Sequence, residues 1–265
     1  MHFRNISGGA VNIYDSYSVL VFGSSFESCT SRGELTGLPH RALGGCLSLS
    51  CIGSRPQRTE SYLTVQNCSF MRCVTRATRR SLLAGRGGAL ALSLLRANVT
   101  VSVKDSDFSQ NSATLFGGAV VVLLYAPVPD YLFLFRGLRM KGNLAGLGGG
   151  GLAMAPFGET RGSRDIHIRV YFEDCQFDRN GGLFGSRAIR QSITFVESRS
   201  RRRTNNLGGA MIISPQFSVI NVTIRRSNFT DNLADRAGAA LLVTPLALRS
   251  LRRAVLLSNV VIEDW

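Results

Sequence analysis

The sequence predicts an all-β fold, a right-handed parallel β-helix of about seven coils with three short strands in each coil. Two recurring motifs lead to this prediction. A Gly-Gly-Ala-aliphatic motif recurs along the 265 residues, and an aromatic residue followed three positions later by Asn recurs between its copies. Successive copies lie about thirty residues apart, and a fixed period of this length is typical of a solenoid built from one repeated unit.

The glycine motif begins one half of each unit. Glycine permits a positive φ and therefore a sharp corner in the backbone. An apolar run follows each motif, such as Ala119 to Leu124, and stops at residues such as Pro127. These runs are too short for helices, so we expect a strand after each corner. The copies begin at Gly8, Gly44, Gly87, Gly117, Gly149, Gly208 and Gly238.

The aromatic motif marks the other half of each unit. Apolar residues stand seven and five positions before each aromatic, as Val101 and Val103 do before Phe108, which is the period of a strand with one buried face. Gly, Asn or Asp usually stands three positions before the aromatic, so we expect a bend between two strands. For an incomplete last unit, we place Val255 and Leu257 on the apolar pair and Ile262 in the aromatic position.

Stacking of the coils predicts two columns of equivalent side chains. Successive strands lie about 4.8 Å apart, so equivalent residues of neighbouring coils come into contact. Stacked Asn side chains can bond amide to amide, and stacked phenyl rings fill a core. We assign both columns to structure and not to ligand binding. The asparagine ladder consists of Asn111, Asn143, Asn180 and Asn232, and the aromatic column of Phe26, Phe70, Phe108, Phe177 and Phe229.

The chain is expected to form a single β-helix domain over residues 1–265, because a solenoid core continues without a boundary. Loop insertions are predicted at one corner, in residues 30–43, 74–86 and 181–207. The chain enters a repeat soon after Met1 and stops within a unit, so we expect it to be part of a longer solenoid with further coils on its flanks. No run of apolar residues is long enough to predict a membrane-spanning segment.

The net charge is +14 and the isoelectric point is about 10.5. A nucleic-acid partner is not expected, because strands committed to a β-helix leave no recognition helix. Arginines gather instead in two of the expected insertions, where they could pair with acidic or sulfated glycans. The alternative is a solvated loop without a ligand. The candidate anion-binding residues are Arg76, Arg79, Arg80, Arg201, Arg202 and Arg203.

The six cysteines contain no Cys-x-x-Cys pair, so neither a metal site nor a metal cofactor is expected. Cys29 and Cys73 take the Asn position in neighbouring coils, and the coil spacing falls within the Cα range that a disulfide allows, which makes this pair a candidate disulfide. Five Asn-x-Ser/Thr sequences favour a secreted glycoprotein. These candidate N-glycosylation sites are Asn5, Asn67, Asn98, Asn221 and Asn228.

The linked motifs, such as Phe108 with Asn111 and then Gly117-Gly118-Ala119-Val120, resemble the repeats of the polymorphic outer membrane proteins. The resemblance covers nearly the whole chain. It implies a right-handed β-helix of the pectin-lyase-like type and an adhesive role outside the cell or on its surface. The expected function is therefore a non-catalytic module that presents a repeat face and basic loops to glycans or cell-surface proteins.

An enzyme of the pectin-lyase-like class, a polysaccharide lyase or a glycoside hydrolase, is the alternative. Such a site needs carboxylates gathered on one outward face of adjacent coils, either as a pair or around calcium. Asp105 and Asp107 are followed in the next unit by Gly137 and Arg139, so the acids do not align. We therefore expect no catalytic residues and no cofactor.

Overall fold

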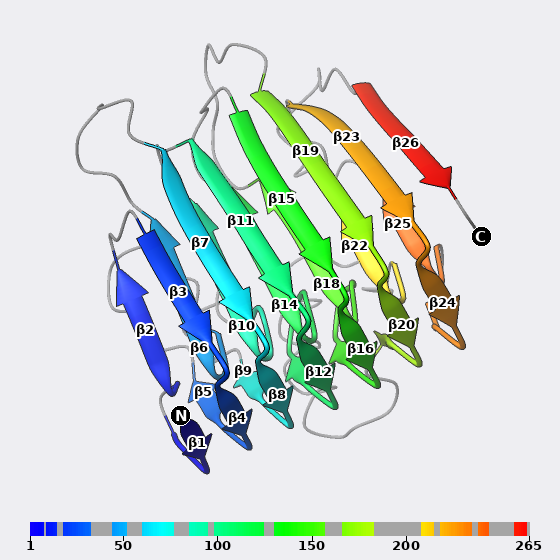
Figure 1. Ribbon diagram of the computed structural model, residues 1–265. Coiled ribbons are helices and arrows are strands. Elements are labelled where there is room, and N and C mark those ends of the chain that lie inside the picture. Colours follow the sequence, from blue (N-terminus) through cyan, green and yellow to red (C-terminus); the bar gives the residue numbers. More distant parts are fainter. Residues whose placement is uncertain are drawn as a thin grey trace, which may run out of the picture.

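The computed structural model of the protein describes residues 1–7, 9–14, 18–32, 44–51, 60–76, 85–94, 98–124, 130–156, 166–182, 208–214, 218–234, 238–243 and 257–263. Within these ranges the regular structure consists of β-strands, and no helix occurs. The strands form four parallel sheets (Figure 1). The predicted all-β class is confirmed, and the structure has one sheet more than the three strands per coil that the sequence predicts.

The longest strands form the sheet that we call the broad sheet, in the order β26-β23-β19-β15-β11-β7-β3. It lies at the front of Figure 1. Except for β26, its strands contain the predicted apolar pairs, and the residue between the two members of each pair lies on the outer face. The strands are β3 (Ser18–Phe22), β7 (Ser61–Gln66), β11 (Val99–Lys104), β15 (Asp130–Arg136), β19 (Ile166–Glu173), β23 (Ser218–Arg225) and β26 (Leu257–Glu263).

After every broad strand except β26, a bend leads to a three-residue strand of the aromatic sheet, which carries the aromatic motif at its centre. The residue at each bend has a positive φ, for example 46° at Asp105 and 61° at Gly137, which confirms the predicted bend. The strands are β1 (His2–Arg4), β4 (Ser25–Glu27), β8 (Ser69–Met71), β12 (Asp107–Ser109), β16 (Arg139–Lys141), β20 (Gln176–Asp178) and β24 (Asn228–Thr230).

The sequence did not predict the five-stranded short sheet that follows the aromatic sheet. Its strands are β5 (Thr30–Arg32), β9 (Val74–Arg76), β13 (Ser112–Ala113), β17 (Leu144–Ala145) and β21 (Gly181–Gly182). Three of these strands take up the first residues of the expected insertions. The later parts of those insertions, residues 33–43, 77–84 and 183–207, lie outside the described residues.

The glycine motif then leads into the glycine sheet, which returns the chain to the broad sheet. Most of its strands are buried on both faces. Ala91, Val121, Leu123 and Ile212 point away from the main core and form a second apolar cluster there. The strands are β2 (Val11–Tyr14), β6 (Leu47–Cys51), β10 (Leu90–Leu94), β14 (Val120–Leu124), β18 (Leu152–Pro156), β22 (Met211–Ile213) and β25 (Leu241–Val243).

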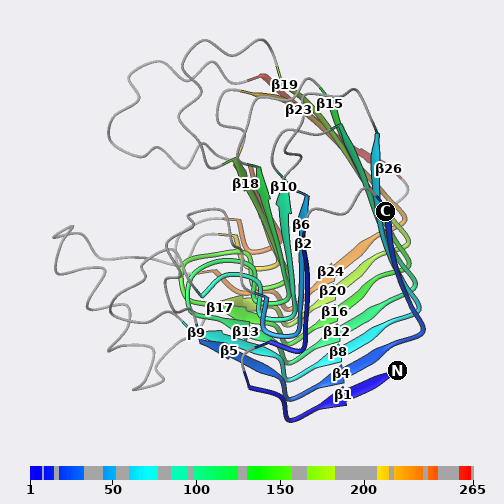
Figure 2. The ribbon, with the colours of Figure 1, turned by 90° about the vertical axis from the view of Figure 1, so that its left-hand side faces the viewer.

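Every strand pairs in parallel with the equivalent strand one turn away, as β11 does with β7 and β15. Figure 2 shows the successive turns stacked behind one another, with the broad, aromatic and glycine sheets enclosing the interior. The main core lies between these three sheets and includes Val101, Val103 and Phe108, all nearly inaccessible to solvent. The molecule is therefore a parallel β-solenoid.

The predicted register of the last unit is wrong. In β26, Val260 pairs with Val222 and Ile262 with Ile224, so these two residues occupy the apolar-pair positions. The aromatic position expected for Ile262 lies five residues further along the repeat. Two apolar pairs with the same spacing occur here, Val255 with Leu257 and Val260 with Ile262, and either pair fits the repeat. No aromatic residue followed by Asn is present to distinguish between them.

Candidate functional site

The four asparagines expected to form a ladder are hydrogen-bonded to one another in the corner after the aromatic sheet. Each Nδ2 donates to the Oδ1 of the next asparagine, at 3.0 Å from Asn111 to Asn143, 2.9 Å from Asn143 to Asn180 and 3.1 Å from Asn180 to Asn232. Asn143 Oδ1 also accepts the backbone N–H of Asn111, and its Nδ2 also donates to the Phe108 carbonyl. The buried amide of Asn143 is thus fully engaged within the fold, which leaves no group for a ligand.

The aromatic column is also continuous, with Met140 between Phe108 and Phe177. The ring centroids are 4.8 Å apart from Phe26 to Phe70 and from Phe70 to Phe108, and 4.7 Å apart from Phe177 to Phe229. Phe3 extends the column with a centroid 4.9 Å from that of Phe26. The sequence analysis missed Phe3 because Ile6 stands where the motif has Asn.

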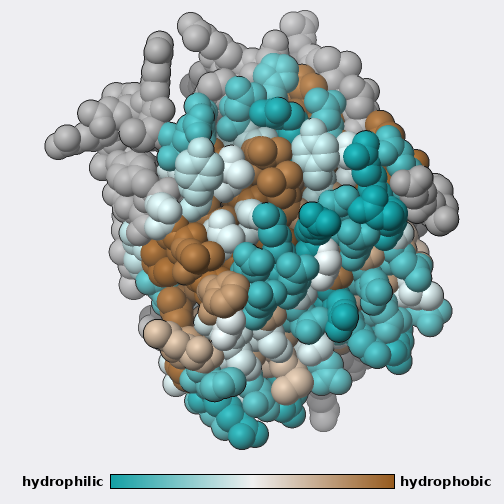
Figure 3. Space-filling model, viewed as in Figure 1, coloured by the Kyte–Doolittle hydropathy of each residue, from teal (hydrophilic) through white to brown (hydrophobic). Residues whose placement is uncertain are grey.

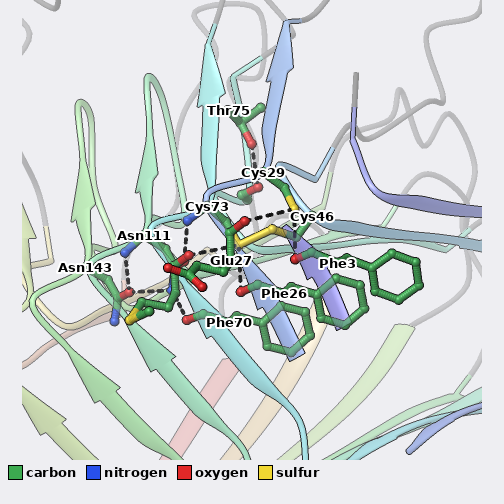
Figure 4. Close-up of a disulfide and its surroundings, with 12 residues drawn as sticks. Phe3, Phe26, Glu27, Cys29, Cys46, Phe70, Cys73, Thr75, Asn111 and Asn143 are labelled. Atoms are coloured by element: carbon green, nitrogen blue, oxygen red, sulfur yellow. Dashed lines mark hydrogen bonds between the residues drawn. A yellow bond between two sulfur atoms is a disulfide. The ribbon is translucent and has the colours of Figure 1, made fainter. Parts of the chain in front are cut away.

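The candidate disulfide between Cys29 and Cys73 is wrong. Cys73 is bonded to Cys46, with 5.9 Å between the Cα atoms, and Cys29 is a free buried thiol (Figure 4). Equivalent residues of neighbouring turns point in the same direction, so their Cβ atoms keep the strand spacing of about 4.8 Å, whereas a disulfide needs about 3.8 Å. Cys46 immediately precedes β6 and packs beside Cys73, which comes from a different corner of the coil, so the two side chains point toward each other.

The other described thiols lie in the core. Cys68 and Cys175 occupy the same inward position after the bend, in different turns. The Cys175 thiol donates to the carbonyls of Phe135 and Glu173, at 3.5 and 3.3 Å. Burial raises the pKa of Cys175 to about 11 and also raises the pKa of Cys68. Both thiols are therefore protonated at neutral pH and poorly nucleophilic.

Of the six candidate anion-binding arginines, only Arg76 lies among the described residues, where it is exposed at the end of β9. Arg79, Arg80, Arg201, Arg202 and Arg203 lie outside the described residues. Arg86, in the same expected insertion as Arg76, is buried. The proposal of an anion site therefore still depends on the sequence pattern alone.

The five candidate glycosylation sites differ in accessibility. Asn5, Asn67 and Asn228 are exposed, whereas Asn98 and Asn221 are half-buried. Asn5 and Asn67 have a positive φ and lie at corners between strands. The exposed asparagines can be reached by a modifying enzyme without unfolding of a sheet.

The outer face of the broad sheet presents rows of equivalent side chains to solvent. Large apolar side chains project from it, with exposed fractions of 67% for Leu20, 59% for Phe22, 48% for Tyr62 and 40% for Tyr171. Figure 3 shows hydrophobic patches set among hydrophilic ones on this side of the molecule. The central row contains Leu20, Thr64, Ser102, Leu134, Tyr171, Thr223 and Val261.

Most charged groups at the lower edge of this face pair with one another. Arg226 Nε donates to Asp174 at 2.8 Å and its Nη2 to Glu173, and Arg136 Nε lies 3.4 Å from Glu173. The hydrogen bond from Arg226 lowers the pKa of the Asp174 carboxyl, so this group stays ionised. Arg225 pairs with Glu263. The face therefore presents few charges that are not already matched by a neighbour.

The described residues include no group of three or more His, Cys, Asp or Glu side chains placed to hold a metal ion. No described segment forms a helix of the length and apolarity needed to cross a membrane. Comparison of the chain with protein-family models, with curated proteins and with solved structures found no match.

Proposed function

We propose that the protein is a non-catalytic extracellular or cell-surface module that binds a glycan or protein partner with the outer face of its broad sheet. The observation that carries the proposal is the exposure of Leu20, Phe22, Tyr62 and Tyr171 on this single face. Exposed apolar side chains that gather on one surface mark interaction sites in soluble proteins. Tyrosine in particular offers an apolar ring for stacking and a hydroxyl for hydrogen bonding.

The charges on the face favour a partner held mainly by stacking and hydrogen bonds. Arg136, Arg225 and Arg226 already pair with carboxylates of the same face. Thr64, Gln66 and Thr223 supply further hydrogen-bonding groups beside the aromatic rings. A neutral glycan or an uncharged protein surface fits this composition. Acidic or sulfated glycans would depend on the arginine-rich segments of the sequence.

We further propose that the solenoid is a right-handed, pectin-lyase-like β-helix of about seven coils, related to the polymorphic outer membrane protein repeats. The linked glycine and aromatic motifs support this relation. The disulfide between Cys46 and Cys73 and the exposed acceptors Asn5, Asn67 and Asn228 support a location outside the cell, because disulfides persist in oxidising compartments.

The test compares binding by the chain and by a Tyr62→Ala/Tyr171→Ala variant on an array of neutral, uronic-acid and sulfated glycans and on cultured cells. We expect the double variant to lose at least about tenfold in affinity, since each ring supplies roughly 1 kcal/mol of contact. Tyr14→Ala is the matched control, because Tyr14 is an exposed tyrosine on the glycine sheet. Equal loss in the control, or unchanged binding in the double variant, would contradict the proposal.

The same samples distinguish the enzymatic alternative. Incubation with polygalacturonate would release unsaturated oligosaccharides if the protein were a lyase. The close carboxylates of the broad face, Glu173 and Asp174, are engaged by Arg136 and Arg226. Because arginine side chains occupy these carboxylates, they are poorly placed to act as general acid and base, and we expect no products.

A further inference from the structure

Three cysteines from different corners of the chain converge inside the first turns of the solenoid. Cys29 and Cys73 occupy equivalent positions in successive turns, and the Val74 N–H donates to the Cys29 carbonyl at 2.9 Å. Cys46 comes from the start of the glycine sheet and is bonded to Cys73. Figure 4 shows the Cys29 side chain directed toward this disulfide. All three residues are completely buried.

The repeat places Cys46 between the two turns that carry the other cysteines. In the equivalent unit Gly151 takes the position of Cys46, and a Cβ there would lie 3.2 Å from Met140 Sδ and 3.3 Å from Phe177 Cδ1. Met140 and Phe177 belong to successive turns of the aromatic column. The residue after the two glycines therefore faces the turn before it and the turn after it.

The neighbouring glycine shows the same arrangement in the backbone. A Cβ on Gly150 would lie 2.6 Å from the Asn143 carbonyl oxygen and 2.3 Å from the Gly181 nitrogen, which belong to the two flanking turns. Asn143 is the equivalent of Cys29, and Gly181 is the equivalent of Val74, the residue after Cys73. By this equivalence Cys46 lies between the turns of Cys29 and Cys73, and a Cβ on Gly45 itself would lie 2.9 Å from the Val74 nitrogen, on the side of Cys73.

We propose that Cys29, Cys46 and Cys73 form a buried disulfide-exchange site in which Cys46 bonds alternately to Cys73 and to Cys29. Burial raises the pKa of the Cys29 thiol, so only its small deprotonated fraction reacts, and in the exchange this Cys29 thiolate attacks the Sγ of Cys46. A bond forms between the sulfurs of Cys29 and Cys46 while the bond between Cys46 and Cys73 breaks. The electron pair leaves on Cys73 Sγ, which takes up the proton that Cys29 released, so no external oxidant or reductant is consumed.

The exchange changes which segment of the chain is closed by a covalent bond. The bond between Cys46 and Cys73 closes residues 47–72, and a bond between Cys29 and Cys46 closes residues 30–45, which include one of the insertions predicted from the sequence. The thiol of Cys29 lies 3.8 Å from the Phe3 carbonyl oxygen and 3.5 Å from the Glu27 carbonyl oxygen, and the Ile6 backbone also contacts it. Formation of a bond to Cys46 would replace these contacts.

The test uses tryptic mapping without reduction, because the sequence separates the three cysteines. Cys73 falls in residues 73–76, Cys29 in residues 5–32 and Cys46 in residues 42–58. Residues 42–58 also contain Cys51, so all variants carry Cys51→Ser. After equilibration in a glutathione buffer, the Cys73→Ser variant is expected to show residues 5–32 cross-linked to residues 42–58 as its main disulfide.

Two controls complete the experiment. Cys68→Ser removes a buried thiol in another corner and is expected to leave the cross-link between Cys46 and Cys73 unchanged. In the chain that carries only Cys51→Ser, catalytic glutathione is expected to produce a minor fraction of molecules with Cys29 linked to Cys46. This measurement does not require that a Cys73 variant folds. The proposal would be overturned if Cys29 and Cys46 stay reduced in the folded Cys73→Ser variant and the Cys51→Ser chain also shows no bond between Cys29 and Cys46.

Discussion

At the scale of single residues, the asparagine ladder shows why one amide recurs at the same corner. Asn143 Oδ1 accepts two hydrogen bonds from Asn111, and its Nδ2 donates one to Asn180 and one to the Phe108 carbonyl. Aspartate lacks the donors and a hydroxyl lacks the second donor. Asparagine therefore satisfies its own side chain and the corner backbone at once.

Asn143→Ala is expected to lower the free energy of unfolding by about 2 to 4 kcal/mol, because it leaves the buried N–H and Nδ2 donors of Asn111 without their acceptor. Urea denaturation followed by circular dichroism measures the change. Gln176→Ala removes an exposed amide from the aromatic sheet and should stay within about 0.5 kcal/mol. Similar losses in both variants would mean that the ladder does not stabilise the fold.

The ladder was predictable from the sequence and the disulfide was not, for a geometric reason. Residues of one motif recur at one position of the coil, so spacing along the chain predicts stacking along the axis, as for Asn111 and Asn143. Contacts across the interior join different motifs, as Cys46 of the glycine motif joins Cys73 of the aromatic motif. The period contains no information about such pairs.

At the scale of elements, the two glycines of the corner at Gly117 and Gly118 have different tasks. Gly117 has a φ of 65°, which suits glycine. Gly118 is not in the positive-φ region, but a Cβ there would lie 2.2 Å from the Gly150 oxygen and 2.5 Å from the Leu144 oxygen. The corner thus packs against the backbone of the next turn at two points. Any side chain at the second glycine would push the two neighbouring turns apart.

Gly118→Ala is accordingly expected to cost about 3 kcal/mol or more, since the backbone that it meets cannot move as a flexible side chain can. Gly23→Ala is the matched control, because Gly23 has a positive φ but a Cβ added there would meet no atom within 4 Å. Its expected cost is about 1 to 2 kcal/mol, from the backbone conformation alone. Equal unfolding midpoints in guanidinium for the two variants would refute the role of close packing.

Elements without a periodic pattern were the ones that the sequence did not predict. Ser112-Ala113 and Gly181-Gly182 form strands of two residues, too short to show any alternation. Their strand conformation comes from pairing with the turns on either side, as β13 pairs with β9 and β17. The broad strands, with an apolar pair in each unit, carry their own signal and were predicted.

At the scale of the whole molecule, stability is distributed along one axis, because each turn pairs only with the turns beside it. Burial varies along that axis. The strand Val120–Leu124 is completely buried, whereas Leu241–Val243 in the same sheet is half-buried. The covalent bond between Cys46 and Cys73 constrains only the turns near the first residues. The middle of the solenoid, around β14, and its last described turns, around β25, should therefore open at different free energies.

Hydrogen exchange measured by mass spectrometry tests this gradient. Amides of Val120–Leu124 are expected to exchange much more slowly than those of Leu241–Val243. A Cys46→Ser/Cys73→Ser variant should exchange faster in Leu47–Cys51 and Ser61–Gln66, because the cross-link between their turns is lost, and should be unchanged in Ser218–Arg225. A uniform increase along the chain would show that the solenoid unfolds as one cooperative unit, and the local exchange proposed for Cys29 would then require global opening.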